Sequence, residues 1–215
     1  MEEKGSYIKV EKLKKIFRRE YALKNINFEI KEKGLYLFLG DNGSGKTTLF
    51  KILSFILFPS EGKIYYFNEE TNGKEDKFLK NIGFSTHNPS LYPELTCYEN
   101  LEFASKFYDV KREKILELLD KFEAIDYMNK KVKELSRGQL QRISLSKAIL
   151  HDPFFLFLDE PFNSLDKRGV KILEDFITEN IERKIIFVSS HTYSDIFEKK
   201  KKVFYLKKGE IFKEE

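Results

Sequence analysis

Residues 40–48 read GDNGSGKTT and directly follow an apolar run, Leu35–Leu39 (LYLFL). The stretch matches the pattern G-x-x-x-x-G-K-[ST], whose glycines let the backbone curl so that its N–H groups point inward at an anion. An uninterrupted apolar run is typical of a strand buried on both faces. Residues Lys46–Phe58 then predict a helix that stops at Pro59. A strand, a glycine-rich loop and a helix in this order predict an α/β protein with a phosphate-binding loop.

The parts of this loop have distinct expected roles at a nucleotide. The helix starting near Lys46 directs the positive end of its dipole at the phosphates. The Lys46 ammonium can reach the β- and γ-phosphates, and the Thr47 hydroxyl is a suitable ligand for Mg²⁺. We therefore predict a site for ATP and Mg²⁺ formed by Gly40, Asp41, Asn42, Gly43, Ser44, Gly45, Lys46, Thr47 and Thr48.

A pair of carboxylates follows a second apolar run, Phe154–Leu158 (FFLFL). In an open parallel sheet, ligands bind at the carboxyl ends of the strands, so Asp159 is expected beside the phosphate loop. There it can hold Mg²⁺, while Glu160 is placed to orient or deprotonate the attacking water. The pair predicts hydrolysis of the nucleotide rather than transfer of its phosphate to a bound acceptor.

The remaining segments surround this centre in a regular order. Ile8, Val10 and the alternating residues Ile26–Ile30 predict strands of an antiparallel sheet. Residues from about 94 to 150 instead show helical spacing, clearest at Ile115–Phe122. Later segments predict further core strands, a helix between them and a terminal hairpin. We therefore expect one domain over 1–215, with a core at 1–87 and 151–215 and an inserted helical subdomain at about 88–150.

Composition narrows the class of protein. The 215 residues carry 39 basic and 35 acidic side chains, a net charge of +4 that gives no nucleic-acid footprint. The lone Cys97 suits a reducing compartment, and the N-terminus has no signal-peptide pattern. No apolar stretch approaches the roughly 18 residues of a membrane span. If the protein works at a membrane, another chain is expected to supply the span.

Residues 135–139 read Leu-Ser-Arg-Gly-Gln. Together with the phosphate loop before them and FFLFLDEP after them, they resemble the LSGGQ signature of ABC-type ATPases. The resemblance extends from about Ile8 to Phe212. It implies a P-loop NTPase core with a mixed parallel sheet, an N-terminal antiparallel β-subdomain and an inserted α-helical subdomain.

The same resemblance implies a head-to-tail dimer, in which the loop of one subunit faces the signature of the other. The partner is either a second copy of this chain or a paralogous subunit. Ser136 and the Gly138 amide stand where a helix starts, so they can form a second anion site. The residues expected to contact the partner's ATP are Ser136, Arg137, Gly138 and Gln139, with Arg137 replacing one glycine of the usual pair.

Three further positions match motifs of that family. Residues 163–166 (Asn-Ser-Leu-Asp) resemble the D-loop, which places Asp166 at the dimer interface. His191, after the apolar residues 185–188, resembles the switch histidine that contacts the γ-phosphate. Phe17 resembles the aromatic residue that stacks on adenine, and Tyr21 is the competing candidate.

One position departs from the family pattern. Residues 82–89 (IGFSTHNP) resemble the Q-loop segment, but His87 stands where glutamine is expected. An imidazole can also bind Mg²⁺ or a hydrogen-bond partner, and it titrates near neutral pH. One interpretation is that His87 replaces the glutamine at the metal and makes turnover pH-sensitive. The alternative is that it points away and water takes its place.

The family resemblance implies a subunit that drives a separate transmembrane permease. Residues 88–101 resemble the segment on which permeases rest, and Tyr92 and Tyr98 are expected to be exposed there. Such a subunit is cytoplasmic and peripheral on the inner face of the cell membrane. The SSH sequence at 189–191 and the short C-terminus favour export over import. The alternative function is a soluble ABC-type ATPase of DNA repair or translation.

Overall fold

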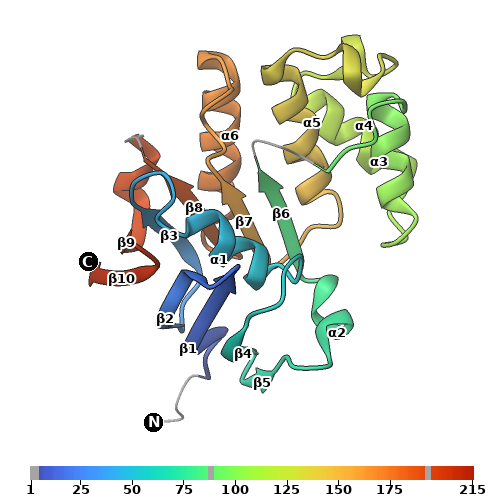
Figure 1. The fold of residues 1–215 in the computed structure, drawn as a ribbon. Coiled ribbons are helices and arrows are strands. Elements are labelled where there is room, and N and C mark those ends of the chain that lie inside the picture. The colour runs from blue at the N-terminus through green and yellow to red at the C-terminus, as the bar shows by residue number, and fades with distance from the viewer. Residues whose placement is uncertain (1–4, 87–89, 192–194) are drawn as a thin grey trace.

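The computed structural model describes residues 5–86, 90–191 and 195–215, which contain two β-sheets and six α-helices (Figure 1). The larger sheet has the strand order β10-β9-β3-β8-β7-β6. Its first pair is antiparallel and its other pairs are parallel, so the predicted mixed sheet is confirmed. The strands are β3 (Gly34–Leu39), β6 (Ile82–Thr86), β7 (Phe155–Asp159), β8 (Ile185–Ser190), β9 (Lys200–Lys207) and β10 (Glu210–Glu214).

The central strands are apolar throughout because both faces of this sheet are covered. In β3, Leu35 and Leu37 pack into the cluster formed with the helices, whereas Tyr36 and Phe38 pack into the cluster on the opposite face. Since side chains alternate along a strand, one continuous apolar run serves both clusters. Aromatic rings fill the second cluster, where Phe157 and Phe187 stack with centroids 4.8 Å apart.

The smaller sheet is antiparallel, with the order β2-β1-β4-β5. Ile8 pairs with Ile30 and Val10 with Phe28, so the alternating apolar residues of the two strands lie on the same face of the sheet. The buried side of the sheet contributes Ile8, Val10 and Phe28 to the cluster that also covers α1. The expected antiparallel subdomain is thus confirmed, with strands β1 (Ile8–Phe17), β2 (Glu20–Ile30), β4 (Glu61–Tyr66) and β5 (Glu69–Glu70).

The helices lie on both sides of the larger sheet, and α3, α4 and α5 form a group at one end of the molecule (Figure 1). Thr96 and Ser136 begin α3 and α5 with reciprocal capping boxes to Glu99 and Gln139. This grouping supports our proposal of an inserted helical subdomain. The helices are α1 (Lys46–Leu53), α2 (Glu75–Leu79), α3 (Cys97–Ser105), α4 (Arg112–Lys121), α5 (Arg137–Ile149) and α6 (Lys167–Asn180), with short 3₁₀ turns at Ile125–Tyr127, Val132–Glu134 and Asp195–Lys199.

The helix after the loop is shorter than expected. It ends at Leu53 rather than Phe58, because Phe55 adopts a left-handed φ of 59° and so leaves the helical backbone region. The apolar residues beyond this point pack outside the helix, and Ile56 and Phe58 are largely exposed. The sequence stays apolar beyond Leu53 although the helix has ended, which is why the predicted helix was too long.

The lysine run at 199–202 spans the boundary between a 3₁₀ turn and strand β9. Only Lys199 ends a helical turn, and the run continues as the first residues of β9. Lys202 and Lys201 pair with Glu214 and Glu32, so these side chains are neutralised locally. None of the helices in the described part of the chain has the length and apolar character that a membrane-spanning segment needs.

Candidate functional site

The predicted catalytic residues meet at the carboxyl edge of the larger sheet. Parallel pairing sets Thr86 opposite Asp159, and Asp159 opposite Ser189. On the other side of β8, Leu39 is opposite Ser190, so the phosphate loop leaves β3 at this same edge. The register therefore brings the loop and the carboxylates together, although they are separated by more than 100 residues of chain.

The loop turns sharply before α1. Gly45 has a φ of 111°, a conformation that L side chains rarely adopt, and a Cβ there would lie 2.8 Å from the Ala22 carbonyl oxygen. A glycine is required at this point for both reasons. The Gly45 carbonyl accepts the Leu49 N–H at 2.9 Å, so the first turn of α1 begins directly from the loop.

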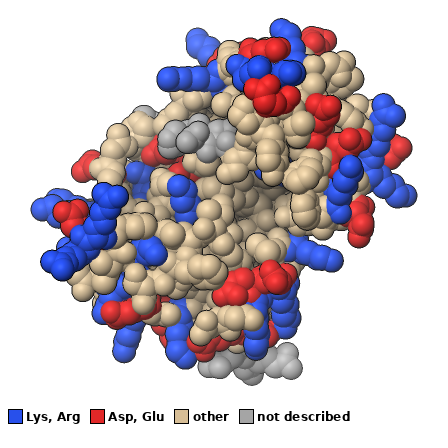
Figure 2. All heavy atoms as spheres, turned by 45° about the vertical axis from the view of Figure 1, so that its right-hand side comes forward, with Lys and Arg blue, Asp and Glu red and all other residues tan. Residues whose placement is uncertain are grey.

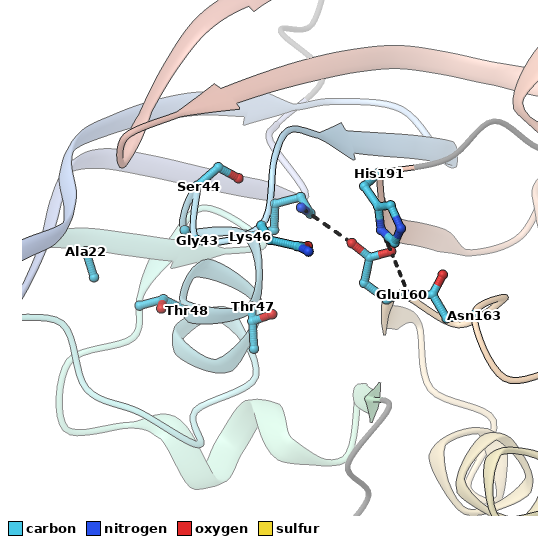
Figure 3. Close-up of a pocket in the computed structure, with 11 residues that line it drawn as sticks. Ala22, Gly43, Ser44, Lys46, Thr47, Thr48, Glu160, Asn163 and His191 are labelled. Atoms are coloured by element: carbon cyan, nitrogen blue, oxygen red, sulfur yellow. Dashed lines mark hydrogen bonds and ion pairs between the residues drawn. The ribbon is translucent and has the colours of Figure 1, made fainter. Parts of the chain in front are cut away.

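A cavity of about 470 Å³ opens above the loop (Figure 3). Residues from β2, the loop and α1 lie on one side, and residues following β7 and β8 lie on the other. Gly40 and Asp41 are not part of this lining, but their backbone carbonyls accept hydrogen bonds from Lys46. The cavity is lined by Ala22, Asn42, Gly43, Ser44, Gly45, Lys46, Thr47, Thr48, Glu160, Asn163 and His191.

Lys46 is buried at the base of the cavity. Its Nζ donates to the Gly40 carbonyl at 2.6 Å and to the Asp41 carbonyl at 3.3 Å. The same ammonium lies 3.4 Å from Glu160 Oε1, and both side chains are at most 10% exposed. The loop cation is thus held beside the carboxylate that the sequence assigns to water activation (Figure 3).

Asp159 is fully buried and is surrounded by hydroxyl groups. Its Oδ2 accepts from Thr47 Oγ1 at 2.8 Å and from Thr86 Oγ1 at 3.4 Å, and its Oδ1 accepts from Ser189 Oγ at 2.6 Å. Carboxylate and hydroxyl oxygens are the donors that Mg²⁺ prefers, and Mg²⁺ usually takes few protein ligands together with water and phosphate oxygens. The Thr47–Asp159 pair therefore fits a Mg²⁺ ion that is bound together with a nucleotide.

Glu160 is fixed by its neighbours from several directions. Its backbone has a left-handed φ of 50°, and its N–H donates to Ser189 Oγ at 3.0 Å. Oε2 lies 2.9 Å from His191 Nδ1 and accepts from Asn163 Nδ2 at 3.4 Å. A non-glycine residue in this backbone region is uncommon, and such strain gathers at functional sites. The carboxylate is held facing the cavity (Figure 3).

A second cavity, of about 330 Å³, lies at the start of α5 and α6. Ser136 Oγ accepts the Gln139 N–H at 3.3 Å, and a Cβ on Gly138 would lie 3.0 Å from the Ser164 carbonyl oxygen. Arg137 is exposed beside them. The cavity is lined by Glu123, Tyr127, Ser136, Gly138, Gln139, Arg142, Ser164 and Asp166, none of which lines the first cavity.

Arg142 connects the elements around this second cavity. Its Nη2 donates to Asp166 Oδ1 at 2.8 Å and its Nη1 donates to Glu123 Oε2 at 2.9 Å. Asp166 Oδ1 also accepts the Gly169 N–H and thereby caps α6. The Gly169 amide and the Arg142 guanidinium lower the pKa of Asp166. Helix α5, which follows the signature segment, and the D-loop are therefore joined through one guanidinium group.

The candidates for adenine binding lie near the first cavity but not in its lining. Phe17 and Tyr21 are 46% and 51% exposed, on the β1–β2 hairpin. The nearest lining residue of that hairpin is Ala22. The choice between Phe17 and Tyr21 remains a prediction, and His87 lies outside the described residues.

Sequence analysis missed several residues of these sites. Thr86 and Asn163 lie in the recognised segments 82–89 and 163–166, but neither was expected to take part in the site. Ala22 belongs to no recognised motif, and only its place beside Tyr21 could have suggested it. Ser189 belongs to a recognised segment, but its contact with Asp159 depends on strand register. Arg142 lies one helical turn after Gln139, which is the only local signal for its role.

The comparisons with known proteins agree with this geometry. The family model described as ABC transporter matches residues 23–163. The lantibiotic transport ATP-binding protein SrtF of Streptococcus pyogenes is 32% identical over 88% of this chain and 82% of its own. The bacitracin transport ATP-binding protein BcrA of Bacillus licheniformis is 32% identical, over 98% of this chain and 70% of its own.

A solved structure gives the same result. It is a dimeric, post-hydrolysis state of the ATP-binding cassette MJ0796 bound to ADP and Pi, with 30% sequence identity and a TM-score of 0.86. The match covers 97% of each chain, and the family predicted from residues 135–139 is thereby confirmed. The chain belongs to the ABC transporter family of ATP-binding proteins, as an ATP-binding and ATP-hydrolysing subunit.

Proposed function

We propose that this chain dimerises head to tail around two ATP molecules and drives export of a substrate through a separate permease. The observation that carries the proposal is the position of Glu160, which lies 3.4 Å from Lys46 and 2.9 Å from His191 at the mouth of the phosphate loop. This arrangement joins a phosphate-binding cation, a carboxylate base and an imidazole in one cavity. Hydrolysis of the terminal phosphate is the reaction that such a set performs.

The residues have separate roles in the proposed reaction. The loop N–H groups and the Lys46 ammonium bind the β- and γ-phosphates. Glu160 accepts a proton from the attacking water, and His191 orients the Glu160 carboxylate from its far side. Thr47 and Asp159 would hold Mg²⁺, which supplies charge neutralisation at the phosphates when it is bound. Lys46 then stabilises the negative charge that remains on the released phosphate.

A second copy of the chain completes the site. Ser136, Gly138 and Gln139 line a cavity that shares no residue with the one above the loop. The start of α5 offers N–H groups to an anion, so the signature segment is suited to the γ-phosphate held by another subunit. Arg142 fixes Asp166 of the D-loop to the same surface. We place the loop of one subunit against the signature of the other, whether that other is identical or paralogous.

The permease docks, in this proposal, on an aromatic groove beside residues 88–101. The groove has a volume of about 400 Å³ and combines residues 90–92 with the exposed side of α3 and the segment after it. Tyr92 and Phe103 are 51% and 41% exposed, and Phe107 is 66% exposed. Exposed aromatic surface of this kind marks a protein interface. Tyr98, which the sequence placed there too, is only partly exposed and packs on Glu102 and Arg112.

We infer the direction of transport from the names of similar proteins. SrtF and BcrA are named for transport of a lantibiotic and of bacitracin, and this favours export over import for the present chain. The same names speak against a soluble role in DNA repair or translation. On the face shown in Figure 2, basic and acidic side chains are interspersed, so it presents no broad basic surface for nucleic acid. The chain would act on the inner face of the cell membrane, held there by the permease.

Site-specific photo-crosslinking in cells tests this assignment. A benzophenone amino acid replaces Phe107 in the groove or, as a control, Phe58, which is 65% exposed in the segment between α1 and β4. We expect the Phe107 probe to crosslink a polytopic membrane protein encoded beside this gene, and the Phe58 probe to give little of that product. Equal yields of that protein from both positions, or none from position 107, would contradict docking at the groove.

A further inference from the structure

The turn between β9 and β10 contacts the phosphate loop from behind. Lys208 and Gly209 form a two-residue turn, with φ values of 49° and 81°. The Gly209 N–H donates to the Ser44 carbonyl at 2.9 Å, and the Gly209 carbonyl accepts the Lys24 N–H at 2.9 Å. One residue near the end of the chain thus joins the loop to strand β2.

The packing around Gly209 leaves no room for a side chain. A Cβ at this position would lie 2.7 Å from the Ala22 carbonyl oxygen and 3.2 Å from Leu23 Cα, both of them backbone atoms. Ala22 and Ser44 line the nucleotide cavity, whereas Gly209 does not. Gly209 therefore holds two walls of the cavity together without reaching it.

The hydrogen bond to Ser44 has a directional consequence. A trans peptide is planar, so the carbonyl of Ser44 and the N–H of Gly45 point in opposite directions. Because Gly209 fixes the Ser44 carbonyl on the outer side, the Gly45 N–H is aimed at the opposite side, where the loop surrounds its cavity. The orientation of one anion-binding N–H is thus set by a residue outside the loop.

We infer that Gly209 is a positioning residue for nucleotide binding, which orients the Ser44–Gly45 peptide toward the phosphates. The inference rests on the proposed phosphate-binding role of residues 40–48. Catalysis by Glu160 does not depend directly on the Gly209–Ser44 hydrogen bond. Loss of this hydrogen bond is therefore expected to lower the affinity for phosphate groups. The affinity for inorganic pyrophosphate is expected to fall as well, because this ligand carries the phosphate groups without adenine.

The test compares two glycines with similar backbones and different surroundings. Gly209→Ala introduces the clash, whereas Gly73→Ala is the control, because Gly73 also has a positive φ of 73° but no atom within 4 Å of its Cβ position. Titration calorimetry with MgATP and with pyrophosphate, alongside melting temperatures without ligand, separates affinity from stability. We expect Gly209→Ala to weaken both ligands about tenfold, the size of one lost hydrogen bond with its strain, and Gly73→Ala to leave both within twofold.

The outcomes are distinct. Equal ligand affinity in the two variants would overturn the inference, whereas a wild-type chain that binds neither ligand would instead overturn the phosphate-loop assignment. Should Gly209→Ala fail to fold, hydrogen exchange on the wild type decides. We expect MgATP to slow exchange at the Gly209 and Lys24 amides together with the loop amides. Protection of the loop amides alone would contradict the inference that Gly209 positions the loop.

Discussion

Thr47 Oγ1 donates a 2.8 Å hydrogen bond to Asp159 Oδ2, which joins the first turn of α1 to the end of β7. Both oxygens are suited to Mg²⁺. We therefore predict that Asp159→Asn lowers Mg²⁺-dependent hydrolysis more than it lowers the affinity for ATP. ATP affinity in EDTA should stay close to wild type, while Mg²⁺-dependent hydrolysis falls by about 100-fold. Phosphate release assays over a Mg²⁺ titration measure this. Asp126→Asn, at an exposed position, serves as the control, and an unchanged Mg²⁺ dependence in Asp159→Asn would remove Asp159 from the metal site.

Lys46→Ala should abolish tight nucleotide binding. The ammonium is 5% exposed and is the cation that lies within the phosphate cavity, so its removal leaves the loop without a positive side chain there. Titration with a fluorescent ATP analogue gives the dissociation constant. Lys51→Ala, later in α1, should bind normally. Retained affinity in Lys46→Ala would contradict the predicted role of the loop lysine.

Substitution of the two hairpin aromatics distinguishes the adenine-binding candidates. We expect Phe17→Ala to weaken ATP binding by about tenfold, as the loss of one stacking contact does, and Tyr21→Ala to have little effect. Inorganic pyrophosphate should bind both variants equally, because it presents no base. The opposite ranking for ATP would transfer the role to Tyr21.

Local sequence patterns were enough to predict the phosphate loop and the strand before it, because the two are adjacent in the sequence. The position of Asp159 followed from an apolar run that ends in an acid. The β6 strand was missed because its sequence, IGFST, has neither a long apolar run nor clear alternation. Its place in the sheet depends on pairing with β7.

Long-range pairing explains the other gaps. Arg142 meets Glu123 and Asp166, residues 19 and 24 positions away, and 34% of the chain is charged, so many other pairs were equally plausible. The link from Gly209 to Ser44 was similarly hidden, since both ends are backbone groups. Contacts of this kind depend on tertiary packing and not on local residue type.

Tyr66 gives a prediction about stability and pH. Its hydroxyl donates to the Leu53 carbonyl at 2.7 Å, and complete burial raises its pKa well above 10. The folded chain therefore keeps this proton when the unfolded chain loses it, so the free energy of unfolding must fall as the pH rises above about 10. Tyr66→Phe should cost about 1 kcal/mol at pH 7 and show a shallower alkaline loss in urea unfolding. Identical alkaline slopes in both proteins would contradict the assignment.

The central claim is that Glu160 is the base of a site completed by a second subunit. Its most direct test is Glu160→Gln, measured for phosphate release and, by light scattering after size exclusion, for mass in MgATP, with exposed Glu182→Gln as the control. We predict that Glu160→Gln binds ATP, hydrolyses it about 1000-fold more slowly and elutes at twice the 25.6 kDa chain mass. Turnover at the wild-type rate, or a variant that stays monomeric with MgATP bound, would contradict the account.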